Sequence, residues 1–106
     1  MTRPTEPATG TRPCVLIVDD SADTLKIVRA VLEQAEYEVC LASDGESALE
    51  CLSWITPDAI LLDAVMPGWS GFETCRRIKA DAGLAQIPVI FMTGLVETEH
   101  VVEAFA

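Results

Sequence analysis

Residues 59–68 of this chain read AILLDAVMPG, and this stretch decides the fold. Its first four residues are apolar, Asp63 follows them directly, and Met66-Pro67-Gly68 then turns the chain. An apolar run too short for a helix and bounded by turn residues is typical of a strand buried on both faces of a parallel sheet. The stretch therefore predicts a central strand that places the carboxylate of Asp63 at its carboxyl end.

Two other apolar runs end in the same way. Residues 14–18 lead into Asp19 and Asp20, and residues 87–92 lead into Thr93. In an open α/β sheet, ligands bind outside the carboxyl ends of the strands. We therefore expect two acidic groups and a hydroxyl to converge at one edge of the sheet.

Strand and helix patterns alternate along the rest of the chain. This order predicts an α/β fold, a doubly wound parallel sheet with right-handed crossovers and helices on both faces. The expected strands are 15–18, 37–42, 59–62 and 88–92, and the expected helices start near residues 24, 45, 71 and 97.

The predicted helices carry recognisable start signals and apolar faces. Ser21 is a candidate N-cap, and the S-x-x-E pattern of a capping box occurs at Ser43 and again at Ser70. Apolar residues recur at helical spacing after two of these caps. They are Leu25, Val28, Leu32 and Ala35 in the first helix, and Phe72, Cys75 and Ile78 in the third.

Length and charge limit the classes of protein to consider. A chain of 106 residues is one domain with a single core. We expect a flexible leader over residues 1–13, which contains three prolines and no signal-peptide pattern, and a folded domain over residues 14–106. The net charge of −10 argues against direct binding of nucleic acid or anionic lipid, and no apolar stretch is long enough to span a membrane.

The remaining special residues fit structural roles. Four widely spaced cysteines without a C-x-x-C pair predict buried thiols in a reducing cytosol rather than a zinc site. Trp54 is expected to pack near a helix end. Trp69 is exposed by pattern as a candidate partner contact, and packing within its loop is the equal alternative. His100 is expected on a solvated helix face among glutamates.

The chemistry of the predicted edge is that of a hard cation and a phosphoryl group. Mg²⁺ takes oxygen ligands in octahedral geometry and retains several waters. The protein therefore needs to supply only a few ligands, such as two carboxylates and a backbone carbonyl. A carboxylate is also a nucleophile that forms an aspartyl phosphate. Transfer of this kind rests on positioning and charge stabilisation, so it needs few residues.

The pattern D-x-x-M-P-G-x-S-G from Asp63 to Gly71, with the earlier Val-Asp-Asp and the later Met-Thr-Gly, resembles the receiver domain of two-component response regulators. The resemblance implies a flavodoxin-like sheet of order 2-1-3-4-5. It implies that Asp63 is the phosphoacceptor, that Asp20 binds Mg²⁺ directly and that Asp19 acts partly through water. The backbone carbonyl of Val65 would be a third metal ligand.

The same resemblance implies further roles. Thr93 would be the switch hydroxyl, and Gly94 would keep access to it open. The expected partners are a sensor histidine kinase or phosphotransfer protein, with a C-terminal output domain, commonly DNA-binding, beyond these residues. A homodimer and a cytoplasmic location are also expected. Such a domain catalyses only its own phosphorylation and dephosphorylation, so it is not an enzyme in the usual sense.

The chain departs from the receiver pattern in one respect. Receivers carry a lysine at the end of a fifth strand, and neither that strand, its helix nor the aromatic switch residue lies within these 106 residues. Lys26 and Lys79 fall on predicted helices and cannot substitute. We therefore expect the sequence to be part of a longer chain.

Two other functions are open to these residues. A phosphatase of the haloacid dehalogenase type would need an acidic residue two positions after the nucleophile, where this chain has Val65. A receiver-like interaction module that is never phosphorylated would normally have lost an acidic residue, and this chain retains all three.

Overall fold

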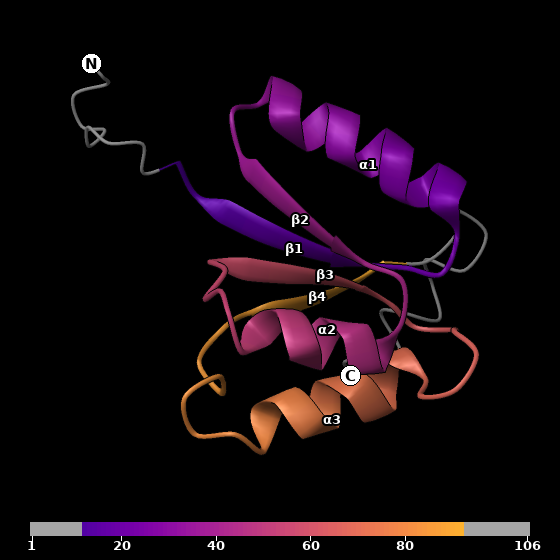
Figure 1. Ribbon diagram of the computed structural model, residues 1–106, viewed down its shortest axis with the longest axis vertical. Helices are drawn as coiled ribbons and strands as arrows, with labels where there is room; N and C mark the ends of the chain where they lie inside the picture. Colours follow the sequence, from indigo (N-terminus) through magenta and orange to yellow (C-terminus); the bar gives the residue numbers. More distant parts are fainter. Residues whose placement is uncertain (1–11, 93–106) are drawn as a thin grey trace.

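The computed structural model describes residues 12–92, in which strands and helices alternate along the chain (Figure 1). The expected order of elements is confirmed over this range, with bounds that differ by one or two residues from the predicted ones. The elements are β1 (Cys14–Val18), α1 (Ala22–Gln34), β2 (Glu38–Ala42), α2 (Gly45–Leu52), β3 (Ala59–Asp63), α3 (Gly71–Lys79) and β4 (Val89–Met92).

The four strands form one parallel sheet in the order β2-β1-β3-β4. The predicted flavodoxin-like order is thus confirmed for these strands. The register pairs Leu61 of β3 with Ile17 of β1 on one side and with Ile90 of β4 on the other. Because β1 and β3 are neighbours and run in the same direction, their carboxyl ends lie side by side.

Helices cover both faces of the sheet, as predicted, but unequally (Figure 1). Helix α1 lies on one face, and α2 and α3 lie together on the other. The fully buried core lies under α2 and α3, because alternate residues of each strand point to that face. Its centre is made of Leu16, Val18, Ile60, Leu62 and Ile78, each with no exposed surface.

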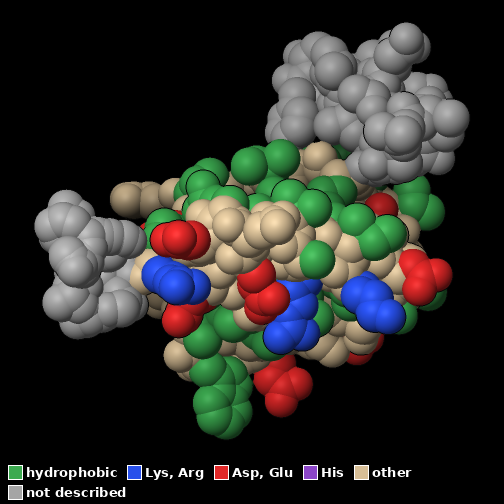
Figure 2. Space-filling model, turned by 90° about the horizontal axis from the view of Figure 1, so that it is seen from above, with side chains coloured by type: hydrophobic (Ala, Val, Ile, Leu, Met, Phe, Trp, Pro, Cys, Tyr) green, Lys and Arg blue, Asp and Glu red, His purple; other side chains and the backbone are tan. Residues whose placement is uncertain are grey.

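The α1 side of the molecule is more open than the sequence pattern suggested. No residue of α1 is fully buried, and Ala35, expected on its buried stripe, is the exposed C-cap. Ile27 of α1 is 63% exposed, and Ile90 of the edge strand β4 is 52% exposed. Figure 2, which views the molecule from this side, shows hydrophobic side chains beside interspersed acidic and basic ones.

The helix caps follow the sequence with one correction. Ser21 and Ser70 cap α1 and α3, each accepting a hydrogen bond from the backbone N–H three residues later. The N-cap of α2 is Asp44 rather than Ser43, because the carboxylate of Asp44 accepts the N–H of Ser47 at 2.7 Å. The prediction of a capping box from Ser43 was therefore wrong.

The predicted buried face of the third helix is confirmed at Ile78 and in part at Cys75, which packs against the core, but not at Phe72. The fully buried residues of this helix are Gly71, Thr74 and Ile78, whereas Phe72 is 47% exposed. Phe72 contacts the ring of Phe91 on β4, with 4.8 Å between the ring centroids. The buried Thr74 hydroxyl donates to the carbonyl of Ser70 at 2.9 Å, which makes its burial tolerable.

Two expectations about side chains were wrong, those for the cysteines and for Trp54. All four cysteines are free but only partly buried, so they are not interior thiols. Trp54 is 78% exposed instead of packed. Trp69 is half-buried, which agrees with the packing alternative: the guanidinium of Arg77 lies over its ring, 4.0 Å from the centroid.

Some predictions concern segments outside the described residues. They are the leader over residues 1–13 apart from its last two residues, Thr93 and Gly94, the helix expected from Glu97 and the solvated position of His100. Within residues 12–92, no helix combines the length and the apolar character needed to cross a membrane.

Candidate metal and phosphoacceptor site

Three carboxylates meet at the carboxyl edge of the sheet. Asp63 is the last residue of β3, and Asp19 and Asp20 follow β1 directly. One oxygen from each of the three lies within 4.8 Å of the others. The structure thus brings together the acidic residues that the sequence placed at neighbouring strand ends.

Asp19 is held rigidly although it follows the strand. It is 6% exposed, and its N–H donates to the carbonyl of Ala42 at 3.1 Å, which extends the pairing of β1 with β2. Its carboxylate accepts the N–H of Ser21 at 2.9 Å. The sequence analysis did not predict this contact. A carboxylate that accepts the N–H of the residue two positions later forms an Asx turn, and Asp at the end of a strand is a signal for such a turn.

Asp63 is held by the loop that follows it. The N–H of Val65 donates to its carboxylate at 3.2 Å. The next helix also approaches β3 closely: the N–H of Gly71 donates to the carbonyl of Ala64 at 2.9 Å. A Cβ atom on Gly71 would lie 2.1 Å from the carbonyl oxygen of Asp63, so only glycine fits there without displacement of the backbone.

The arrangement raises the pKa of Asp63 from 3.8 to about 6. Burial is the largest cause, and the charges of Asp19 and Asp20 add to it, while the hydrogen bond from Val65 opposes the rise. Within residues 12–92, no lysine or arginine forms an ion pair with these carboxylates. The site therefore holds repelling negative charge that a bound cation would relieve.

The donor set is compatible with a divalent metal site. Carboxylate oxygens are the ligands that hard cations prefer, and the cluster combines a buried, a partly buried and an exposed acid. The exposed Asp20 leaves the cluster accessible from solvent. The side chain of Val65 is 68% exposed, beside the carboxylate of Asp63.

Comparison with known proteins agrees with this geometry. The family model described as the response regulator receiver domain matches residues 15–106. This chain belongs to the receiver-domain family. Membership argues against the dehalogenase-type phosphatase considered above.

Response regulators with similar receiver domains come from several bacteria. Response regulator PleD of Caulobacter vibrioides is 42% identical over 81 residues, which are 76% of this chain and 18% of PleD. DNA-binding response regulator MtrA of Mycobacterium tuberculosis is 33% identical over 91 residues, which are 86% of this chain and 39% of MtrA. The chain therefore spans less than half the length of these relatives.

Solved receiver structures share the fold. Chemotaxis response regulator CheY4 of Vibrio cholerae is 31% identical with a TM-score of 0.77, over 89% of this chain and 80% of that one. The signal receiver domain of a histidine kinase from Syntrophus aciditrophicus is 33% identical with a TM-score of 0.76, over 88% of this chain and 70% of that one. Membership of the receiver-domain family therefore gives this chain a signalling role as a phosphoacceptor domain.

Proposed function

We propose that Asp63 is the phosphoacceptor of this receiver domain and that its phosphorylation depends on Mg²⁺. The observation that carries the proposal is the convergence of Asp63 with Asp19 and Asp20 within 4.8 Å at the carboxyl edge of the sheet. Asp63 is the member of the cluster that ends a buried strand and opens the loop to α3. Its position thus matches the position of the acceptor in the family motif.

The protonation state of Asp63 suits a nucleophile. With a pKa of about 6, its carboxyl group is mostly ionised at neutral pH. A carboxylate oxygen attacks phosphorus, a new O–P bond forms, and the bond from phosphorus to the donor's leaving group breaks. The N–H of Val65 donates a hydrogen bond to one oxygen of this carboxylate, Oδ1, and so fixes its orientation.

The metal-binding roles follow from the cluster and the family pattern. Asp20, Asp63 and the backbone carbonyl of Val65 would hold Mg²⁺ directly, and Asp19 would act partly through water. Mg²⁺ would neutralise negative charge between the acceptor and an incoming phosphoryl group. Thr93, which lies outside the described residues, would supply the switch hydroxyl, with Gly94 keeping access open.

The proposed function also implies partners and a cellular location for this domain. A sensor histidine kinase or a phosphotransfer protein would supply the phosphoryl group, in a cytoplasmic signalling pathway. The folded receiver would begin at residue 14, after a leader of thirteen residues. An output domain would respond to the switch; the relative MtrA is named as a DNA-binding response regulator. The domain would also form a homodimer. The net charge of −10 disfavours nucleic-acid binding by these residues themselves.

The test is phosphorylation of the purified protein with acetyl phosphate and MgCl₂, followed by intact-mass and peptide analysis. We expect one added phosphoryl group on Asp63, no labelling of Asp63→Asn, and none of the parent when EDTA replaces MgCl₂. Asp23→Asn is the matched control, because Asp23 is an exposed acid of α1 outside the cluster. Equal labelling of Asp63→Asn and the parent would refute the assignment, and an unlabelled parent would favour the unphosphorylated interaction module.

A further inference from the structure

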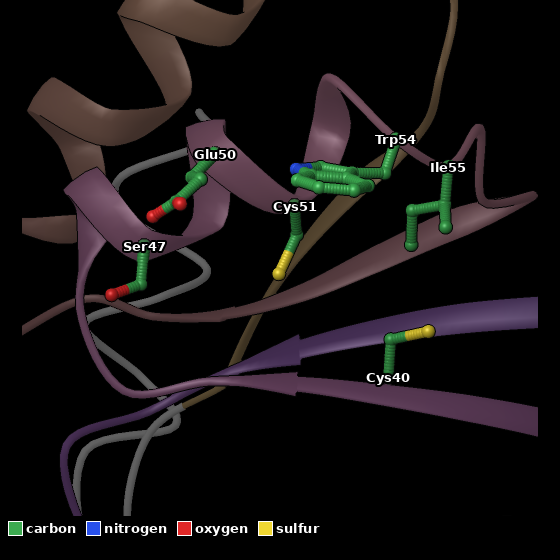
Figure 3. Close-up of a pocket in the computed structure, with 6 residues that line it drawn as sticks. All are labelled: Cys40, Ser47, Glu50, Cys51, Trp54 and Ile55. Atoms are coloured by element: carbon green, nitrogen blue, oxygen red, sulfur yellow. The ribbon is translucent and has the colours of Figure 1, made fainter.

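A second concave site lies between β2 and α2 and shares no residue with the acidic cluster. It has a volume of about 320 Å³. This size is at the lower end of the range for small-molecule pockets, roughly 300–1,000 Å³. The residues that line it are Cys40, Ser47, Glu50, Cys51, Trp54 and Ile55 (Figure 3).

The walls of this pocket are mainly apolar. Figure 3 shows the thiol of Cys51 directed from α2 toward the sheet, with Cys40 on β2 opposite it and with Trp54 and Ile55 at one end. The indole of Trp54 is 78% exposed, so one side of this large ring system faces solvent. An exposed indole beside a concave apolar surface offers a planar ligand a ring to stack on.

The other end of the pocket is acidic. Within residues 12–92, the carboxylate of Glu50 takes part in no hydrogen bond and no ion pair. Ser47 lies at the same end (Figure 3), and its hydrogen bonds hold the pKa of the Asp44 carboxyl below its usual value. No lysine or arginine lines the pocket, so its negative charge is not compensated locally.

The Cys51 thiol acts as a neutral wall rather than as a ligand or nucleophile. Burial, followed by the neighbouring Cys40 and then Glu50, raises the pKa of the Cys51 thiol. A raised pKa keeps a thiol protonated and unreactive at neutral pH. In the described part of the chain, the cysteines also do not converge into a metal-binding cluster, which is found only for the three aspartates.

We propose that this pocket binds a small, flat aromatic cation, such as an aryl amidinium or a benzylic ammonium ion. The aromatic part would stack on Trp54 and contact Cys51 and Ile55, and the cationic group would pair with Glu50. The cationic group is attracted by two neighbours, because a cation near an indole face is attracted to the ring as well as to the carboxylate. The net charge of −10 also favours cationic ligands over anionic ones of the same shape.

The test compares three probes of the same shape and different charge: benzamidinium, benzamide and benzoate. Titration is followed by the NMR signal of the Trp54 indole N–H, with Trp69 as an internal reference outside the pocket. We expect saturable binding of benzamidinium with a Kd on the order of millimolar, as for other fragments of this size. Benzamide should bind at least about threefold more weakly, and benzoate should not bind.

Two variants separate charge recognition from simple apolar binding. Glu50→Gln should weaken benzamidinium binding about three- to tenfold and leave benzamide binding unchanged. Glu46→Gln is the matched control, because Glu46 lies one turn earlier on α2 and lines a different pocket. Because Trp54→Ala lacks the indole signal, binding to this variant is followed by saturation-transfer difference spectra of the probes themselves; the substitution should abolish binding of both probes without unfolding the protein, since Trp54 is exposed.

The proposal fails on any of three results. The first is the absence of saturable benzamidinium shifts at the Trp54 signal. The second is equal binding of all three probes. The third is equal loss of affinity in Glu50→Gln and Glu46→Gln. None of these results depends on phosphorylation of Asp63.

Discussion

Replacing Asp63 with asparagine should stabilise the protein when no divalent cation is present. The substitution removes one of three negative charges that lie within 4.8 Å of one another. It keeps the shape of the side chain and an oxygen that can accept the N–H of Val65, which now donates to the carboxylate at 3.2 Å. The main change is therefore electrostatic.

The size of the effect follows from the pKa of Asp63. A pKa of about 6 in the folded state against 3.8 for an ordinary aspartate corresponds to about 3 kcal/mol of unfavourable free energy for the ionised form. This figure is an upper bound because the carboxyl group is partly exposed and solvent screens its charge. We expect Asp63→Asn to raise the free energy of unfolding by about 1–3 kcal/mol at pH 7.5.

The pH dependence has a definite sign. Between pH 3.8 and about 6, the folded state holds a proton on Asp63 that the unfolded state has already released. The stability of the parent therefore falls as pH rises through this window, and the cost is fully present above it. The advantage of Asp63→Asn should accordingly be largest at pH 7.5 and should shrink toward pH 4.

Urea unfolding at low ionic strength with EDTA, at pH 4.5 and pH 7.5, measures both effects. Glu38→Gln is the control, because Glu38 is an exposed acid of β2 outside the cluster, and it should change stability little. An Asp63→Asn protein that is no more stable than the parent at pH 7.5, or an advantage that is the same at both pH values, would refute the reasoning.

Three further predictions concern the same edge of the sheet. Millimolar Mg²⁺ should raise the melting temperature of the parent by several degrees through preferential binding to the folded state; Asp20→Asn should remove most of this rise and Asp19→Asn less of it, and calorimetry without detectable binding heat would contradict the site. Gly71→Ala should lower the free energy of unfolding by more than about 2 kcal/mol, because its Cβ would overlap the carbonyl of Asp63 at 2.1 Å, and unchanged stability in urea would show that the helix shifts freely. The phosphorylated form should be long-lived, because the exposed side chain of Val65 cannot hydrogen-bond an attacking water; Val65→Asn should accelerate phosphate loss measured by Phos-tag gels, and equal lifetimes would remove this explanation.

The acidic edge was predictable because it depends on local pattern and one topological rule. Each apolar run indicates where a buried strand ends, and parallel strands bring those ends together. Local pattern alone therefore placed Asp19 and Asp63 at the same edge of the sheet, while their direct proximity depends on β1 and β3 being neighbours. The sheet order was available only through the resemblance to receiver domains, since β1 and β3 are neighbours in the sheet but are not consecutive strands in the sequence.

The errors arose where long-range packing chooses between local alternatives. Ser43 and Asp44 are both good N-caps, so local chemistry does not decide between them. The choice coincides with a close approach at Gly45, where an added Cβ would lie 2.3 Å from the hydroxyl oxygen of Thr74 and 2.8 Å from the ring of Trp69. Both residues come from a later part of the chain, and no window of sequence around Ser43 contains them.

The partial burial of the cysteines has a similar origin. Cys40 and Cys51 were expected to be interior residues because cysteine is among the most buried residue types. They instead line the opening between β2 and α2, where Trp54 lies outside the core. The distance between the end of α2 and strand β2 depends on how all the helices pack on that face of the sheet. The periodicity of α2 alone could therefore not predict this distance.

The contacts of the basic side chains affect the rate at which charged molecules associate with this protein. Glu33 pairs with Arg29 at 3.0 Å, Glu73 pairs with both Arg76 and Arg77, and the ammonium of Lys79 donates to two backbone carbonyls near β4. None of these cations pairs with the cluster at the sheet edge, which therefore keeps an uncompensated negative field. Small anionic phosphodonors should approach it slowly at low ionic strength and faster as salt screens the field, whereas a partner with a basic docking surface should show the opposite salt dependence of its association rate.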